Sequence, residues 1–253
     1  RKRFFWIHNP SKYLLKYRYL SKIFFNKFNI IFSSEYHKST YPFWAPSLSR
    51  IVIPYGIDNG IKKKRKNKAP KSTAIFTSNP LRDLEWLMKN WQLKIYPNVK
   101  NAKLNLFTGI STYGDFGKKH SSKIEKILNI AESLKNKGVN FNEPIKREDL
   151  FKKLNKARIF LYKGTHDETF CMAAAEAQAL AIPAVVCDFG AMKERIIDNK
   201  TGYVCKNTED FNSKAIKLLN DDKIWMRMHK NLLINDNHLR WSEIAKKWKK
   251  IIN

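Results

Sequence analysis

The sequence has little cysteine, no long apolar run and few acidic residues. These shortages argue against a disulfide framework, a zinc site and a membrane-spanning helix, and they leave a strongly positive chain. Its three cysteines, Cys171, Cys187 and Cys205, are widely separated and none has Cys-x-x-Cys spacing. An odd number without such spacing argues against a disulfide framework or a zinc site. Because unpaired cysteines are usual in reducing compartments, we expect a cytoplasmic protein.

No uninterrupted apolar stretch approaches the roughly 20 residues that a membrane-spanning helix needs. The stretch 22–32 is interrupted by Asn26, Lys27 and Asn29. The chain opens with Arg1 instead of methionine and shows no signal-peptide pattern, so we expect a fragment or a processed product. The sequence therefore predicts a protein that is soluble or peripheral to a membrane.

Basic residues outnumber acidic ones. The chain has 49 lysines and arginines and 22 aspartates and glutamates, which gives a net charge of +27 at pH 7. Such an excess attracts anionic partners such as membrane surfaces, nucleic acids or phosphorylated substrates. The alternative is compositional, because Lys, Asn, Ile, Phe and Tyr are abundant together, as AT-rich coding produces. A nucleic-acid binder would interleave exposed aromatics with a basic face. Here the aromatics fall mostly in predicted strands and helix core faces, so nucleic acid is not the expected partner.

The chain does contain a regular alternation of short apolar segments and longer helical patterns. Apolar residues recur at steps of three and four in 81–95 and 124–134, and further helices are expected over 147–156 and 170–180. The short segments, rich in β-branched and aromatic residues, are typical of buried parallel strands. They are 4–7, 29–32, 50–53, 73–76, 103–107, 158–162 and 183–187. This alternation predicts an α/β fold with a doubly wound parallel sheet, which binds ligands at the carboxyl ends of its strands.

The first three strands are too few for a stable sheet of their own. A turn cluster around Gly56 and a lysine-rich stretch follow them. We therefore expect residues 1–58 to be the end of an amino-terminal domain, 59–71 a basic linker and 72–236 a second domain.

The strongest candidate site is the segment 162–180. It follows a predicted strand and opens a helix around Phe170, where free N–H groups and the helix dipole favour a diphosphate. Glu168 and Glu176 would lie roughly 12 Å apart along a helix. Two carboxylates at that spacing could accept hydrogen bonds from hydroxyls at both ends of a nucleotide sugar. The alternative, two exposed helix acids, fits less well with the apolar strand that begins at Pro183.

Four motifs occur in order: Ile-Val-Ile-Pro-Tyr-Gly-Ile-Asp at 51–58, the E-x7-E pair Glu168 and Glu176, an apolar stretch ending in Lys-Glu at 182–194, and Thr-Gly-Tyr-Val at 201–204. The set resembles the family 4 glycosyltransferases, retaining enzymes with the GT-B fold, and covers most of residues 30–250. The resemblance implies a Rossmann-like donor domain at the carboxyl end and the remnant of a second Rossmann-like domain. It also implies transfer of a sugar from a nucleotide-diphosphate donor without a metal, and the sequence has no Asp-x-Asp pair.

The resemblance implies roles for matching residues. Glu168 would hold donor-sugar hydroxyls at the catalytic centre, and Glu176 would hold the ribose. The backbone N–H groups of Phe170, Cys171 and Met172 would cradle the distal phosphate.

The loop after 73–76 resembles a Ser-x-Pro-x-Arg-Gly-Leu motif. Here Ser78 begins the loop, and Arg82 resembles the basic residue that binds the diphosphate. The alternative is a solvated helix charge, although Arg near a helix N-terminus is unfavourable unless an anion is present. Asn142 and Pro144 stand at the strand end where the family holds the base.

Three positions depart from the family pattern, because Asp83, Thr169 and Cys171 stand where glycines are usual. Side chains at the last two would narrow the approach to the phosphates. Cys171 has two interpretations: a thiol whose pKa is lowered by the helix N-terminus, or simple packing. His8, at the end of the first strand, resembles a family histidine near the reaction centre and is a third catalytic candidate.

The resemblance also divides the chain by function. Residues 1–58 would end the acceptor domain, 72–236 would bind the nucleotide sugar, and 237–253 would form a helix that packs back on the first domain. Polysaccharide biosynthesis is one expected setting, with a glycan, lipid or polysaccharide as acceptor. The positive charge favours an acceptor at an anionic membrane. Two alternatives stay open: a catalytically incomplete donor-binding domain, and a basic nucleic-acid-binding protein.

Overall fold

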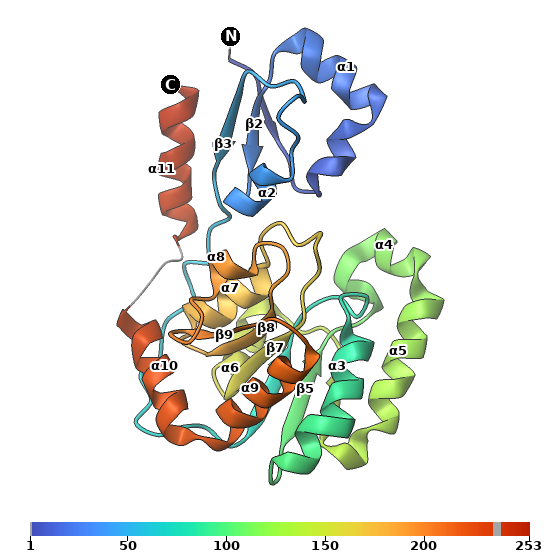
Figure 1. The fold of residues 1–253 in the computed structure, drawn as a ribbon, viewed down its shortest axis with the longest axis vertical. Coiled ribbons are helices and arrows are strands. Elements are labelled where there is room, and N and C mark those ends of the chain that lie inside the picture. Colours follow the sequence, from blue (N-terminus) through green and yellow to red (C-terminus); the bar gives the residue numbers. More distant parts are fainter. Residues whose placement is uncertain (1, 235–238) are drawn as a thin grey trace.

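The computed structural model describes residues 2–234 and 239–253, which form two parallel β-sheets (Figure 1). The smaller sheet has the order β1-β2-β3 and the larger one β6-β5-β4-β7-β8-β9. The strands of the smaller sheet are β1 Phe4–Trp6, β2 Asn29–Phe32 and β3 Ser49–Val52. Those of the larger sheet are β4 Thr73–Phe76, β5 Lys103–Phe107, β6 Val139–Asn142, β7 Ile159–Tyr162, β8 Ala184–Cys187 and β9 Gly202–Cys205. The predicted doubly wound α/β fold is confirmed.

The order of the larger sheet fixes where a ligand binds. The chain starts at β4 in the middle, adds β5 and β6 on one side, and then returns to add β7, β8 and β9 on the other. The loops after β4 and β7 therefore diverge and leave a crevice at the carboxyl ends of these two strands. Open α/β sheets bind their ligands at this kind of switch point.

Helices connect the strands and cover the larger sheet. α9 packs on β8, β9 and the segment after α3, while α5 packs on α3 and β6. The helices are α1 Tyr17–Asn26, α2 Glu35–Ser39, α3 Leu84–Asn90, α4 Gly114–Lys119, α5 Ser121–Ser133, α6 Arg147–Leu154, α7 Met172–Ala179, α8 Met192–Arg195, α9 Thr208–Asn220, α10 Asp222–Ile234 and α11 Trp241–Ile252. Short 3-10 turns lie at η1 Ser11–Leu15, η3 Tyr96–Asn98, η4 Ile110–Tyr113 and η5 Lys135–Lys137, and a π-type turn at η2 Trp91–Ile95.

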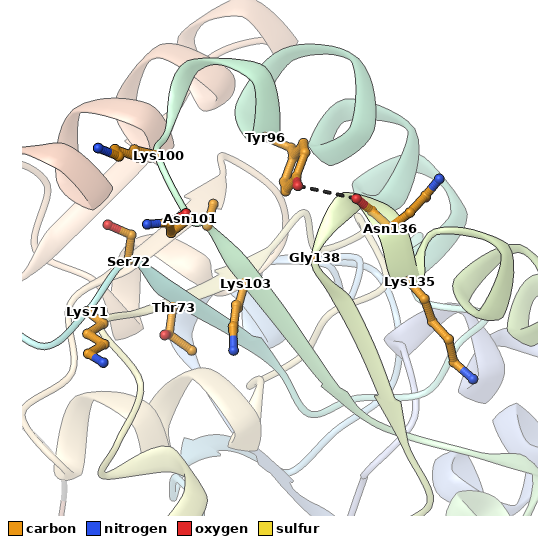
Figure 2. Close-up of a pocket in the computed structure, with 11 residues that line it drawn as sticks. Lys71, Ser72, Thr73, Tyr96, Lys100, Asn101, Lys103, Lys135, Asn136 and Gly138 are labelled. Atoms are coloured by element: carbon orange, nitrogen blue, oxygen red, sulfur yellow. Dashed lines mark hydrogen bonds between the residues drawn. The ribbon is translucent and has the colours of Figure 1, made fainter.

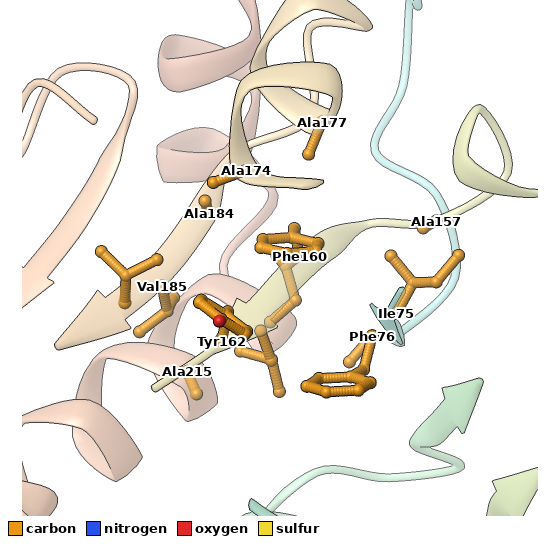
Figure 3. Packing of buried hydrophobic residues seen from close by; sticks show 14 of the residues in the cluster. Ile75, Phe76, Ala157, Phe160, Tyr162, Ala174, Ala177, Ala184, Val185 and Ala215 are labelled. Atoms are coloured by element: carbon orange, nitrogen blue, oxygen red, sulfur yellow. The ribbon is translucent and has the colours of Figure 1, made fainter. Parts of the chain in front are cut away.

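The core of the larger unit is built by strands that are buried throughout. All four residues of β7 and of β8 are buried. Large side chains on β7, such as Phe160, meet small ones on the neighbouring helix, where Ala174 and Ala177 of α7 face the sheet (Figure 3). The alanines let α7 lie close to the sheet, and this holds the helix N-terminus at the strand ends.

Two segments join the units. Residues 59–71 cross from the smaller sheet to the larger one without forming a helix or strand. At the other end of the chain, α11 returns to the smaller sheet (Figure 1). Its Ile244 packs there against Ile31 and Ile53. The predicted boundary between residues 236 and 237 lies outside the described residues. Within the described chain, no helix is both long and apolar enough to span a bilayer.

Candidate functional site

A cavity of about 240 Å³ lies at the switch point of the larger sheet. Its wall combines the loop after β4, the loop after β7, the start of α7 and the start of α6. Six of the predicted site residues line it: Ser78, Arg82, Glu168, Cys171, Met172 and Glu176. The fold thus brings both motif carboxylates and the predicted diphosphate arginine to one place.

Glu168 is held from two sides. The Tyr162 hydroxyl donates to Glu168 Oε2 at 2.7 Å, and Arg82 Nη1 lies 3.3 Å from the same oxygen. Behind it, Gly190 has a φ of +57°, and a Cβ there would come within 2.4 Å of the Glu168 carbonyl oxygen. Only glycine permits so close an approach at residue 190, and this contact helps to position the main chain of Glu168.

The turn after β4 directs Arg82 into the cavity. The Asn79 side chain accepts a hydrogen bond from the Leu81 N–H at 2.8 Å, and the Asn79 carbonyl accepts one from the Arg82 N–H at 2.9 Å. Asp83 then takes the left-handed conformation, with a φ of 58°. Aspartate tolerates this conformation better than most residues, which explains why it can replace the glycine of the motif. Helix α3 consequently begins only at Leu84, later than the predicted start at residue 81.

The sequence did not single out Arg147, which forms the second charged pair of the cavity. Arg147 opens α6, and its Nη2 contacts Glu176 Oε1. Its Nε also lies 3.8 Å from Asp58 Oδ2, in the motif that precedes the linker. Burial raises the pKa of Glu176, and the Arg147 guanidinium opposes that rise. The sequence did contain a signal for Arg147. Like Arg82, it is a positive charge near the start of a helix, where a cation is unfavourable unless an anion is present.

Helix α7 begins at Met172, two residues later than predicted. Cys171 has a φ of 64° and caps the helix in the left-handed conformation, so the segment 168–171 is not helical. The continuous helix that the separation of roughly 12 Å between Glu168 and Glu176 assumed is therefore not present before Met172. Helical N–H groups without an intrahelical partner begin at Met172 and Ala173, and both residues line the cavity.

The thiol of Cys171 packs in the interior. Burial raises its pKa well above the ordinary value, and the nearby Glu168 carboxylate acts in the same direction. The interpretation that the helix N-terminus lowers this pKa was therefore wrong. Phe170 is also buried, with its ring 5.0 Å from the ring of Tyr55 and 4.2 Å from the Arg195 guanidinium.

Thr169 and His8 lie outside the cavity wall, where the two units meet. The Thr169 carbonyl accepts hydrogen bonds from the hydroxyls of Ser33 at 3.0 Å and Ser34 at 2.7 Å. The Thr169 hydroxyl is 3.5 Å from the His8 carbonyl oxygen. His8 itself stacks on Tyr55, with a contact of 2.6 Å between its Nδ1 and the phenol oxygen. The loop that carries Glu168 is thus seated directly on the smaller sheet.

Asn142 and Pro144 lie at the end of β6, also outside the wall of this cavity. The Asn142 side chain donates to the carbonyls of Leu106 at 3.2 Å and Asn140 at 3.1 Å. Pro144 is so close to Gly109 that an added Cβ there would lie 2.8 Å from its ring. Both residues therefore stand at the carboxyl end of β6, just before Arg147 opens α6.

A larger depression, of about 810 Å³, lies at the amino ends of the strands of the larger sheet, opposite the switch point (Figure 2). Its lysines, Lys71, Lys100, Lys103 and Lys135, are exposed and splayed around the amino ends of β4, β5 and β6. It contains none of the predicted site residues, and open α/β sheets bind their ligands at the carboxyl ends of their strands, not at these amino ends. Within residues 2–234 and 239–253, no three His, Cys, Asp or Glu side chains come together as a metal site.

Solved structures with the same fold are numerous, and three of them share 14–17% sequence identity with the chain. Staphylococcus aureus TarM, in complex with Fondaparinux, alpha-GlcNAc-glycerol and UDP, has 17% identity and a TM-score of 0.74 over 100% of this chain and 51% of its own. Anabaena HepE, in complex with UDP and glucose, has 14% identity and a TM-score of 0.78 over 100% of this chain and 71% of its own. Sucrose-phosphate synthase from Thermosynechococcus elongatus has 16% identity and a TM-score of 0.72 over 98% of this chain and 66% of its own.

The chain spans about half of the length of TarM. No curated protein sequence matches it. A sequence model of the family described as Glycosyl transferases group 1 matches residues 113–233, which include α7, both motif glutamates and Arg147. Residues 113–233 thus match the glycosyl transferases of group 1, and the chain as a whole has the GT-B glycosyltransferase fold.

Proposed function

We propose that the chain is the donor-binding part of a retaining glycosyltransferase that takes a sugar from a nucleotide diphosphate. The observation that carries the proposal is the convergence of Arg82, Glu168, Arg147 and Glu176 on one cavity at the switch point. Two solved structures of similar fold, HepE in complex with UDP-glucose and TarM in complex with UDP, support this donor class.

In the proposed complex, the two motif carboxylates exchange partners. Ribose hydroxyls donate to Glu176 in place of Arg147, and sugar hydroxyls donate to Glu168 in place of Arg82. Both guanidinium groups then contact the diphosphate, together with the N–H groups at the start of α7. Each exchange replaces one charge-assisted contact by another, so the bound donor leaves no buried charge unpaired.

The proposed reaction breaks the bond between the anomeric carbon and the diphosphate oxygen. The diphosphate leaves with the bonding electrons, and its developing charge is met by Arg82, Arg147 and the α7 N–H groups. An acceptor hydroxyl attacks from the face that the diphosphate leaves, and its proton passes to the departing phosphate, so the configuration is retained. We assign the charge stabilisation to these protein groups and expect no metal requirement. His8 is proposed to lie beside the acceptor, supported by the contact of its carbonyl with Thr169.

The remaining parts of the proposal concern setting. Residues 1–58 are assigned to the acceptor domain, 72–236 to the donor domain and α11 to the closing helix. Three unpaired, buried cysteines support a cytoplasmic setting. The acceptor, a glycan, lipid or polysaccharide, is not specified by any described side chain.

Calorimetric titration with UDP-, GDP- and ADP-sugars tests the proposal. One donor should bind, and Glu176→Gln should weaken it about 10- to 100-fold. Glu148→Gln, an exposed acid on α6, is the matched control and should leave the affinity unchanged. Binding without transfer to any acceptor would favour the incomplete donor-binding domain. Failure of all donors to bind, with tight salt-sensitive binding to nucleic acid instead, would contradict the proposal.

A further inference from the structure

Tyr55 stands where the two connections between the units cross. The next residue, Gly56, lies so close to Trp241 that an added Cβ would come within 2.6 Å of the Trp241 backbone. The Ile57 N–H donates to the Leu239 carbonyl at 2.8 Å, and the Trp241 N–H donates to the Ile57 carbonyl at 3.3 Å. These contacts hold the backbone on the carboxyl side of Tyr55, so its side chain starts from a fixed point.

The ring of Tyr55 packs between the two units. Its centre lies 5.0 Å from the centre of the Phe170 ring, which belongs to the loop that also carries Glu168. It lies 5.7 Å from the centre of the nearest ring of Trp6, the last residue of β1. The phenol therefore links the loop of the proposed donor site to the strand that ends just before His8.

The imidazole of His8 lies against two aromatic side chains. Its centre is 4.5 Å from the ring of Trp6, and its plane is 9° from that of the Tyr55 ring. Nδ1 faces the Tyr55 hydroxyl at 2.6 Å. Because Nδ1 is engaged and the residue is otherwise exposed, Nε2 is the nitrogen that a ligand can reach.

The short contact also decides which ring nitrogen carries the proton. Burial raises the pKa of Tyr55 to about 12, against an opposing influence of the Ser33 hydroxyl, so the phenol keeps its proton at neutral pH. An imidazole nitrogen binds a proton far better than a neutral phenol oxygen does. The stronger arrangement is therefore O–H···Nδ1, which leaves the single proton of a neutral imidazole on Nε2.

A neutral histidine in this state donates through Nε2 and has no lone pair free on that atom. It can hold an oxygen atom of a ligand but cannot take a proton from it. The neighbouring Thr169 hydroxyl, 3.5 Å from the His8 carbonyl oxygen, places this donor beside the loop that carries Glu168. In the reaction proposed above, the proton of the acceptor hydroxyl passes to the departing phosphate. A histidine that only donates does not compete for that proton.

We propose that Tyr55 is a positioning residue for His8 and holds its imidazole as a hydrogen-bond donor to the acceptor hydroxyl, not as a base. The inference rests on the proposed function, because only a bound donor and acceptor give the Nε2–H group its role. The position of the proton in the empty protein does not depend on that function.

Nitrogen NMR of protein with ¹⁵N-labelled histidine locates the proton. At about pH 8, where an unperturbed imidazole is neutral, Nδ1 of His8 should have the chemical shift of an unprotonated nitrogen, and Nε2 that of a protonated one. His8→Gln identifies these signals by their loss. Tyr55→Phe keeps the ring but removes the hydroxyl, so both shifts should move toward those of an exchanging mixture. Tyr36→Phe, the control, removes a hydroxyl that donates to the His166 carbonyl, and it should leave the shifts unchanged.

A protonated Nδ1 in the parent overturns the proposal, and so do shifts that Tyr55→Phe leaves unchanged. Melting temperatures equal to that of the parent would show that both phenylalanine variants are folded. Because these signals are read without a ligand, they decide the position of the proton even if no nucleotide sugar binds. Failure of all donors to bind would contradict the proposed function and leave this result standing.

Donor hydrolysis tests the role of the Nε2–H group, with water as the probe acceptor and the tightest-binding nucleotide sugar as donor. His8→Gln supplies an N–H donor but no base, so it should be several-fold faster than His8→Ala. Tyr55→Phe should lower the rate about two- to tenfold, the effect of one hydrogen bond. If His8 acts as a base, His8→Gln and His8→Ala should be equally slow, by about 10²- to 10⁴-fold. That result would overturn the proposal.

Discussion

The carboxyl group of Glu176 is subject to two opposing influences. Burial raises its pKa, and the guanidinium of Arg147 lowers it. A carboxyl group must be ionised to accept hydrogen bonds from both ribose hydroxyls. With a raised pKa, the ionised form is present above that pKa and is lost as the pH falls through it. Arg147 therefore has two proposed roles, because it meets the diphosphate and keeps Glu176 ionised in the empty site.

Arg147→Ala should make donor binding more sensitive to acid. Without the guanidinium, the pKa of Glu176 rises further, so the pH at which affinity is half lost moves upward. Calorimetric titration from about pH 5 to about pH 8 measures this midpoint. Lys146→Ala, which removes the neighbouring exposed cation, is the control. Parallel pH profiles for Arg147→Ala and the parent would show that Arg147 does not set the ionisation of Glu176.

The three thiols should be unreactive in the folded protein. All are buried, and burial raises the pKa of each, that of Cys187 to about 11. Because the thiolate is the reactive form, Ellman's reagent should label native protein slowly and denatured protein at three equivalents. Rapid labelling of Cys171 in the native state, identified by its loss in Cys171→Ala, would contradict the buried position of this thiol.

At the scale of elements, α11 connects the end of the chain to the smaller sheet through one buried side chain. Ile244 is fully buried against Ile31 and Ile53, whereas Ile252 on the same helix is 56% exposed. Ile244→Ala should lower the free energy of unfolding by about 2–5 kcal/mol. Ile252→Ala, which makes the same chemical change, should alter it by no more than about 0.5 kcal/mol. Urea unfolding measures both. Equal effects would show that α11 does not pack on the sheet.

The strands could be predicted because their signal is local. Segments such as 159–162 and 184–187 are apolar throughout, and a strand buried on both faces needs this pattern. The doubly wound parallel sheet could also be predicted, because alternating strands and helices leave few parallel arrangements, whereas the order of its strands comes from the structure. The arrival of Glu168 and Arg82 at one crevice is a consequence of that order.

The starts of helices were less predictable, because they depend on single backbone angles. Asp83 and Cys171 both take left-handed conformations, and each delays its helix. The pairing of Arg147 with Glu176 brings together residues 29 positions apart, on two different helices. No spacing within one helix could reveal this contact, although the unfavourable position of Arg147 gave a hint.

At the scale of the whole molecule, the cavity depends on both units. The loop that carries Glu168 is bonded to Ser33 and Ser34, and the Glu194 carboxylate of α8 accepts hydrogen bonds from the N–H groups of Glu35 and Tyr36 at 3.1 and 2.7 Å. These contacts link the carboxyl ends of the strands in the smaller sheet to the loop that carries Glu168 and to α8. A ligand that orders this loop therefore stabilises the contact between the units as well as the larger unit itself.

Donor binding should therefore raise the melting temperature of the chain in one transition. At a donor concentration of about 100 times Kd, binding stabilises the folded state by about 2.7 kcal/mol. For a chain of this size, that corresponds to an increase of about 5–10 °C. Differential scanning fluorimetry measures the increase, which Glu176→Gln should reduce by about half for each tenfold loss of affinity at this donor concentration, because the stabilisation follows the logarithm of the affinity.

The same measurement tests whether a metal is needed. If Arg82, Arg147 and the α7 N–H groups meet the diphosphate charge, the increase should be the same with EDTA as with added Mg²⁺ or Mn²⁺. An increase that appears only with the metal would contradict the proposed assignment of this charge to protein groups. Two separate transitions, with only the second shifted by donor, would show that the smaller unit unfolds independently of the site.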